Sequence, residues 1–227
     1  MCGRYVLTSP LDVLKARFRF GGVEGILPPR YNVAPRQAAP VILSEEARRV
    51  ARPMEWGLLP AWVKEFGTAL RPINARAETV AEKPSYRSAL KTRRVLVPAD
   101  GFYEWRPSPS GRGKEPVLFR LAGGGPFAFA GLRELWTGGG ESAFETFAIL
   151  TTSPNELVGK VHGRMPVILA EEDEEAWLDP SLRDPAPLLP MLRPFPAGRM
   201  EAFLASLRVN SSANDDPSLH EGLRPLA

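Results

Sequence analysis

Proline is the residue that most restricts how this chain can fold. The chain holds 24 prolines among its 227 residues, which is about twice the share of an ordinary globular protein. Each proline fixes its own φ angle and lacks a backbone donor, so prolines end helices and avoid the interior of sheets. The sequence therefore predicts few long helices, many fixed turns and a fold that relies on strands.

Apolar runs between these prolines predict the strands. The expected strands lie at residues 41–43, 49–59, 95–97, 117–121, 127–132, 144–151, 164–169 and 207–210. Short helices are expected between Ser9 and Gly21, over residues 80–91, and after Ser153, which forms a capping box with Glu156. We find no internal repeat that would indicate a solenoid.

Composition excludes several classes of protein. No apolar run reaches the roughly 18 residues that indicate a membrane-spanning helix, and no basic-then-apolar signal sequence opens the chain. We therefore expect a cytoplasmic protein without a membrane partner. One cysteine and two histidines are too few for a disulfide or for most zinc sites, so we expect no metal and no cofactor. The net charge of +3 allows nucleic-acid binding without requiring it.

Cys2 is the only cysteine and follows the first methionine directly. Small second residues generally permit removal of that methionine, so we expect the mature chain to begin at Cys2. Its α-amine and thiol, with reference pKa values of about 8 and about 8.5, would both be partly nucleophilic near neutral pH. An amine and a neighbouring thiol convert an aldehyde into a thiazolidine ring. A lone cysteine near a terminus is, however, more often a small buried apolar residue.

Two further stretches carry side chains suited to nucleic acid. Trp56 and Trp62 flank a glycine and a proline; we expect one in the core and the other as a platform on which bases stack. Asn74 and Arg76 are two residues apart, so in an extended segment they point to the same face. An amide beside a guanidinium suits a phosphate or another polar group.

Glu104 and His162 are candidates for proton transfer. Glu104 lies inside an aromatic run, and a carboxylate in apolar surroundings has a raised pKa and can act as an acid or base. The alternative is a solvent-facing glutamate on an amphipathic strand. His162 is expected at the C-terminus of a short helix stopped by Gly163, where the helix dipole favours its protonated form. Its alternative role is to cap a free carbonyl.

Six motifs in order make the chain similar to a known family. They are Cys-Gly-Arg-Tyr at 2–5, Tyr-Asn-Val-Ala-Pro at 31–35, Trp-Gly-Leu-Leu-Pro-Ala-Trp at 56–62, Ile-Asn-Ala-Arg-Ala-Glu-Thr at 73–79, Pro-Ala-Asp-Gly-Phe-Tyr-Glu-Trp at 98–105 and His-Gly-Arg-Met-Pro-Val-Ile-Leu at 162–169. The set resembles the SRAP (SOS response-associated peptidase) family of abasic-site processing proteins. The resemblance runs from residue 2 to about residue 214, and the combination is far more specific than any single motif.

The resemblance implies capture of abasic sites in single-stranded DNA. The ring-opened sugar of such a site carries an aldehyde, which Cys2 would attack through its amine and its thiol. Asn74 would orient the amine or the sugar, Glu104 would act as general acid and base, and His162 would help open the sugar. The acidic residue that follows this histidine in the family is Gly163 here, a difference from which we expect little effect.

The resemblance also implies a DNA-binding surface. Arg4 and Arg76 would hold phosphates next to the lesion, while Pro35 and Trp62 would pack on or wedge against bases. Trp105 would support the site rather than contact DNA. Bound to damaged DNA, the protein would be found with the nucleoid, and we expect it to act as a monomer.

The fold implied by the resemblance is α+β. We expect one domain over residues 1–227, with a curved, mostly antiparallel sheet or open β-barrel core flanked by short helices and a loose tail from about residue 215.

Two alternatives to covalent capture stay open on the sequence. Cys2 could be the N-terminal nucleophile of a peptidase, at least for its own first residue, although no oxyanion-hole motif is recognisable. The chain could also bind single-stranded DNA without a covalent step, with strong salt dependence. Strand cleavage of the lyase type is a further outcome of the same Schiff-base chemistry.

Overall fold

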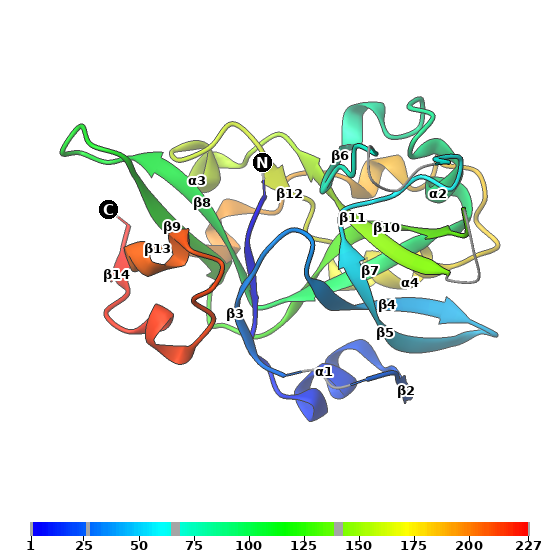
Figure 1. The fold of residues 1–227 in the computed structure, drawn as a ribbon, viewed down its shortest axis with the longest axis horizontal. Helices are drawn as coiled ribbons and strands as arrows, with labels where there is room; N and C mark the ends of the chain where they lie inside the picture. The colour runs from blue at the N-terminus through cyan, green and yellow to red at the C-terminus, as the bar shows by residue number, and fades with distance from the viewer. Residues whose placement is uncertain (1, 26–27, 65–68, 139–142, 227) are drawn as a thin grey trace.

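A computed structural model describes residues 2–25, 28–64, 69–138 and 143–226. Within these residues the strands form two sheets (Figure 1). The larger follows the order β12 (Met165–Pro166), β11 (Phe144–Thr152), β10 (Phe127–Trp136), β7 (Arg94–Ala99), β4 (Ala38–Glu45), β5 (Arg48–Trp56) and β2 (Gly22–Val23), and β6 (Asn74–Arg76) also pairs with β11. The smaller follows the order β14 (Arg224–Pro225), β13 (Met200–Leu204), β9 (Lys114–Leu121), β8 (Gly101–Pro107), β1 (Tyr5–Leu7) and β3 (Arg30–Val33).

Five strands of the larger sheet close into a barrel. Strands β11, β10, β7, β4 and β5 pair antiparallel in turn, and β11 then pairs parallel with β5 through the partners Thr146–Glu55 and Phe147–Trp56. The helices around it are short: α1 (Leu11–Phe18), α2 (Arg87–Thr92), α3 (Glu156–Gly159) and α4 (Glu174–Leu178). The prediction of an α+β domain with a mostly antiparallel barrel is confirmed, and its five-strand core is closed rather than open.

Aromatic side chains join the N-terminal strand to the barrel. Tyr5 of β1 is fully buried and packs edge-on against Trp56, with ring centroids 5.3 Å apart, and against Phe129 at 6.0 Å. Trp56 in turn stacks on Phe147. Such rings combine large buried area with preferred edge and stacked geometries. The strand that follows Cys2 is therefore held where the two sheets meet (Figure 1).

Asp100 fixes the other end of β1. Its Oδ2 accepts the backbone N–H groups of Thr8 at 2.6 Å and Ser9 at 2.8 Å, and its Oδ1 accepts the Ser9 hydroxyl. β1 also pairs with β3 on one side and β8 on the other. With both edges paired and its exit capped, β1 gives the N-terminal residues a fixed direction.

Three of the elements expected from the sequence illustrate how the structure differs from that expectation. The helix expected over 80–91 begins only at Arg87, because Pro84 disfavours helical geometry in the residue before it. Asn155 rather than Ser153 caps α3, accepting the Val158 N–H at 2.8 Å. The strand expected at 207–210 is instead a 3-10 helix, which Ser206 caps by accepting the Arg208 N–H.

The end of the chain packs on the smaller sheet. Residues Pro217–His220 form a 3-10 helix, and Leu219 is fully buried against Tyr103 and Val6. No helix of the described residues is long and apolar enough to cross a membrane.

His220 sits in a largely buried aromatic setting. Its Nε2 lies 3.1 Å from the Tyr103 hydroxyl, and its ring meets Tyr31 edge-on at 5.1 Å. Burial lowers the pKa of His220 below its ordinary value, the charge of Arg120 lowers it further, and Asp100 opposes this shift. The neutral imidazole is therefore the form that the folded chain holds.

We expect His220 to make the fold less stable in mild acid. Below the ordinary histidine pKa of about 6.5 the unfolded chain binds a proton that the folded chain resists, so stability is complete above that pH and falls as pH drops through the lower folded value. Urea unfolding at pH 7.5 and 5.5 should show a larger loss for the wild type than for His220→Phe, which keeps the ring contact with Tyr31. Equal losses in the two proteins would contradict this.

Candidate functional site

Cys2 lies at the centre of a buried polar cluster. The residue is fully buried, and its Sγ lies 3.9 Å from the backbone oxygen of Arg4. Asn74, at the start of β6, donates from Nδ2 to the backbone oxygen of Cys2 at 2.8 Å. Burial raises the pKa of the Cys2 thiol, and the nearby negative charge of Glu104 raises it further. The thiol is therefore held protonated in this setting.

Glu104 brings a buried carboxyl group to the same place. It lies on β8, the strand paired with β1, and it is only 3% exposed. Burial raises the pKa of Glu104, while the facing His162 acts in the opposite direction. The prediction of a buried carboxyl group is confirmed in preference to a solvent-facing one, and its raised pKa favours the acid form relative to that of an exposed glutamate.

His162 faces Glu104 from the turn after α3. Its Nδ1 lies 3.8 Å from Glu104 Oε1 and 3.0 Å from the backbone nitrogen of Arg164, with the Arg164 carbonyl oxygen at 3.1 Å. Unprotonated Nδ1 can accept that N–H, and protonated Nδ1 can donate to that carbonyl. The ring thus has a backbone partner in both protonation states, which suits a group that exchanges protons.

The side-chain oxygen of Asn74 has no hydrogen-bond partner among the described residues. This Oδ1 is buried and accepts no hydrogen bond from them. The position of Asn74 itself is well fixed, because β6 pairs with β11 and the Tyr86 hydroxyl donates to the Asn74 carbonyl at 3.2 Å. Buried acceptors are rarely left unpaired, so this oxygen is a ready acceptor for an amine or a hydroxyl group.

The four residues predicted to face DNA lie in different settings. Arg4 is half-buried, whereas Arg76 at the end of β6 is exposed. Pro35 is half-buried in the turn after β3, and Trp62 is 66% exposed. Trp62 lines a hollow of about 910 Å³ together with Arg36, Lys64, Leu70 and Arg71. Of the two tryptophans, Trp56 is the core residue and Trp62 is the exposed one.

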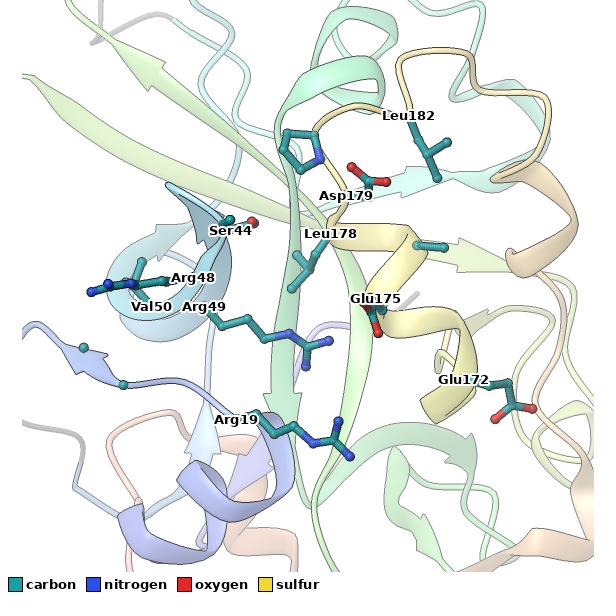
Figure 2. Close-up of a pocket in the computed structure, with 15 residues that line it drawn as sticks. Arg19, Ser44, Arg48, Arg49, Val50, Glu172, Glu175, Leu178, Asp179 and Leu182 are labelled. Atoms are coloured by element: carbon teal, nitrogen blue, oxygen red, sulfur yellow. The ribbon is translucent and has the colours of Figure 1, made fainter.

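A larger hollow than the one beside Trp62 lies elsewhere in the described residues. It measures about 1170 Å³ and separates the start of β5 from α4, as Figure 2 shows. Arg19 and Arg49 point into it from one side and face Glu175 on the other (Figure 2). No residue of the Cys2 cluster lines it. Size therefore does not identify the chemical site in this protein.

The described residues contain no cluster of three or more His, Cys, Asp or Glu side chains that could hold a metal ion. The polar groups around Cys2 are instead one carboxyl, one amide and one imidazole. These groups can move protons and orient an amine or a carbonyl compound.

Two residues with clear roles in this geometry were not singled out from the sequence. Arg164 makes a bidentate ion pair with Glu78 and donates to the Thr151 carbonyl at 2.6 Å, which fixes the backbone that contacts His162. Asn32 is fully buried and bonds to Arg4 at 2.9 Å. The signal available was positional, since Arg164 follows His162 by two residues and Asn32 lies in the Tyr-Asn-Val-Ala-Pro motif.

The fold and this cluster define a class of protein: a single barrel domain that holds an N-terminal cysteine beside a carboxylic acid, an amide and an imidazole. Residues 1–212 match the family described as SOS response associated peptidase (SRAP). The chain belongs to this family.

Its relatives include proteins from bacteria and vertebrates. The abasic site processing protein YoqW of Bacillus subtilis is 42% identical over 223 residues, covering 97% of this chain and 99% of YoqW. The abasic site processing protein HMCES of Gallus gallus is 33% identical over 86% of this chain and 66% of its own length. A crystal structure of a Bacteroides thetaiotaomicron protein superposes with a TM-score of 0.88 at 32% identity, over 99% of this chain and all of the other.

Proposed function

We propose that this protein captures abasic sites in single-stranded DNA by forming a thiazolidine crosslink through Cys2, once Met1 has been removed. The observation that carries the proposal is the meeting of buried Cys2 and Glu104 with half-buried Asn74 and His162 in one cluster. Family membership supports abasic-site processing in general. The chemistry of the cluster supports this particular reaction, and a monomer contains every group that the reaction needs.

The reaction balances without a cofactor. The free α-amine of Cys2 adds to the aldehyde carbon of the ring-opened sugar and gives a carbinolamine. Protonation of its hydroxyl group releases one water molecule and leaves an iminium ion. The thiol then loses its proton, and its sulfur adds to the iminium carbon. One aldehyde and one aminothiol thus become a thiazolidine and water, with no change of oxidation state.

Glu104 is the group suited to carry the protons. In its acid form it can protonate the departing hydroxyl, and the carboxylate that results can take the proton of the thiol. The Cys2 thiol needs such a base because burial raises its pKa and keeps it protonated. The raised pKa of Glu104 favours its acid form relative to that of an exposed glutamate, and transfer of its proton leaves the carboxylate. His162 is suited to protonate the ring oxygen of the closed sugar.

The remaining residues would bind and orient the DNA. Asn74 holds the Cys2 carbonyl and can accept the new α-amine on its unused Oδ1. Arg4 and Arg76 would contact phosphates, and exposed Trp62 and half-buried Pro35 would pack against bases.

The raised thiol pKa also weighs against a general cysteine peptidase. A hydrolytic cysteine acts as a thiolate and has a lowered pKa, whereas burial raises that of Cys2. Peptidase activity limited to the removal of Met1 would not need a thiol that is deprotonated in the resting protein.

A denaturing gel tests the proposal directly. Mature protein beginning at Cys2 is incubated with a labelled single strand that carries one abasic site, and we expect a slow, heat-stable band. Protein that keeps Met1 should give no band, because the Cys2 nitrogen is then a peptide nitrogen and cannot add to the aldehyde. A strand with a tetrahydrofuran analogue, which has no aldehyde, should give none either. Absence of the band with verified mature protein would refute covalent capture.

A further inference from the structure

Among the described residues, the hydrogen-bond partners of Arg4 are neutral groups. Its Nη1 donates to Asn32 Oδ1 at 2.9 Å and to the Val209 carbonyl at 2.8 Å, and its Nη2 lies 3.4 Å from the Asn210 carbonyl at the surface. Both hydrogens of Nη1 are therefore used. Nε and the second hydrogen of Nη2 make no hydrogen bond to the described residues, so one edge of the guanidinium remains available.

No carboxylate balances the charge of Arg4 within the described residues. Arg30 on β3 differs in this respect, because a carboxylate balances its charge through an ion pair with Asp215. Burial lowers the pKa of Arg4, and no acidic side chain opposes that shift. A half-buried guanidinium with neutral partners and one unused edge matches a bidentate anion such as a phosphodiester.

Asn32 determines how Arg4 is held. It is fully buried on β3, and its Nδ2 donates to the carbonyls of Val209, Ser211 and Asn214. Its Oδ1 is then directed at Arg4. Because an amide can collect carbonyls on its nitrogen and a guanidinium on its oxygen, Asn32 fixes the segment 207–214 and the orientation of Arg4 together.

A second contact holds the same segment. Trp105 donates from Nε1 to Asn210 Oδ1 at 2.7 Å, and its ring lies 6.0 Å from the guanidinium carbon of Arg4. The ring and segment 207–214 confine the guanidinium, which leaves Arg4 few alternative rotamers. Trp105 is thus suited to support the site rather than to contact DNA.

We propose that Asn32 is a positioning residue for DNA binding: it holds Arg4 by Nη1 so that the Nε/Nη2 edge binds a backbone phosphate of the single strand. This deepens the proposed function and rests on its DNA-binding part. The ligand group is the phosphodiester itself, so the contact is independent of base sequence and of the abasic aldehyde.

The salt dependence of binding tests this role. Affinity for a labelled single strand without any abasic site is measured over a range of salt concentrations for wild type, Arg4→Ala, Asn32→Ala and the double variant. Loss of one phosphate contact lowers the slope of log K against log salt by about 0.7 on single strands. We expect that loss in Arg4→Ala and in Asn32→Ala, and no further loss in the double variant, because the two residues act as one unit.

Matched variants separate positioning from general destabilisation. The Asn214 amide donates to the Arg208 carbonyl in the same segment without touching Arg4, so Asn214→Ala should keep the wild-type slope. Arg4→Lys keeps the charge, but its single ammonium nitrogen cannot hold Asn32 and also present a two-nitrogen edge to a phosphate, so it should lose the slope even if Asn32→Ala fails to fold.

The outcomes are distinct. A wild-type slope in Arg4→Lys, an unchanged slope in folded Asn32→Ala, or additive losses in the double variant would each overturn the role of Asn32. Failure of the wild type to crosslink an abasic strand would refute the covalent proposal and leave these binding measurements unaffected.

Discussion

Replacing Cys2 with alanine should convert a crosslinking protein into one that cleaves the strand. Alanine at position 2 is small enough for Met1 to be removed, so the variant keeps a free α-amine but has no thiol. The amine can still form an iminium ion with the abasic aldehyde. Without sulfur to close the ring, that ion can lose the proton on the neighbouring carbon and expel the 3′ phosphate by β-elimination. We expect complete loss of the heat-stable crosslink and the appearance of a shortened labelled strand.

The same denaturing gel reads both products, and borohydride reduction should trap the Schiff base of the variant as a covalent band. Cys2→Ala that keeps Met1 is the matched control, since its nitrogen at residue 2 is a peptide nitrogen and cannot form an iminium ion. Abasic DNA that stays intact with mature Cys2→Ala would contradict a reaction that begins at the amine. It would point instead to the thiol as the first nucleophile.

The residues proposed to carry the chemistry could be singled out because their signals are local. Cys2 is unique in the chain, Glu104 lies in an aromatic run and Asn74 precedes Arg76 by two residues. The structure brings Cys2, Asn74, Glu104 and His162 into contact or close approach. The strands of the barrel could be predicted for the same reason, because apolar β-prone runs of this length indicate buried strands.

The rest depends on contacts that are distant in sequence. Asn32 reaches Val209 and Asn214 across nearly the whole chain, and nothing in the pattern around position 32 announces such partners. Segment 207–210 has strand-like composition, yet the cap at Ser206 turns it into a 3-10 helix that contacts Arg4. Closure of the barrel through the parallel pairing of β11 and β5 is likewise a tertiary event. Local propensity is a weak guide to such features.

Loss of Arg94 should strongly reduce the stability of the fold. It is 5% exposed at the start of β7, and its guanidinium donates to four backbone carbonyls. Those of Leu90 and Lys91 belong to the last turn of α2, and those of Trp177 and Asp179 lie at the end of α4. Carbonyls at helix C-termini lack intrahelical donors and carry the negative end of the dipole, so one buried cation satisfies two helix ends.

Replacement by methionine would fill similar space and leave these buried acceptors without a donor. Each such loss costs about 1–3 kcal/mol, so we expect Arg94→Met to lower the free energy of unfolding by about 3 kcal/mol or more. Arg106→Met removes a half-exposed pair with Glu115 at 3.1 Å and should cost about 1 kcal/mol or less. Urea unfolding of both variants measures the difference, and similar losses would show that the buried carbonyls find other donors.

The effect of Arg94 should extend to the chemical site. Tyr86 is the N-cap residue of α2, and its hydroxyl donates to the carbonyl of Asn74. A loosened α2 would free Asn74, whose amide holds the backbone of Cys2. We therefore expect folded Arg94→Met to crosslink an abasic strand more slowly than the wild type, while Arg106→Met keeps the wild-type rate. A wild-type rate in folded Arg94→Met would show that β6 alone, through its pairing with β11, positions Asn74.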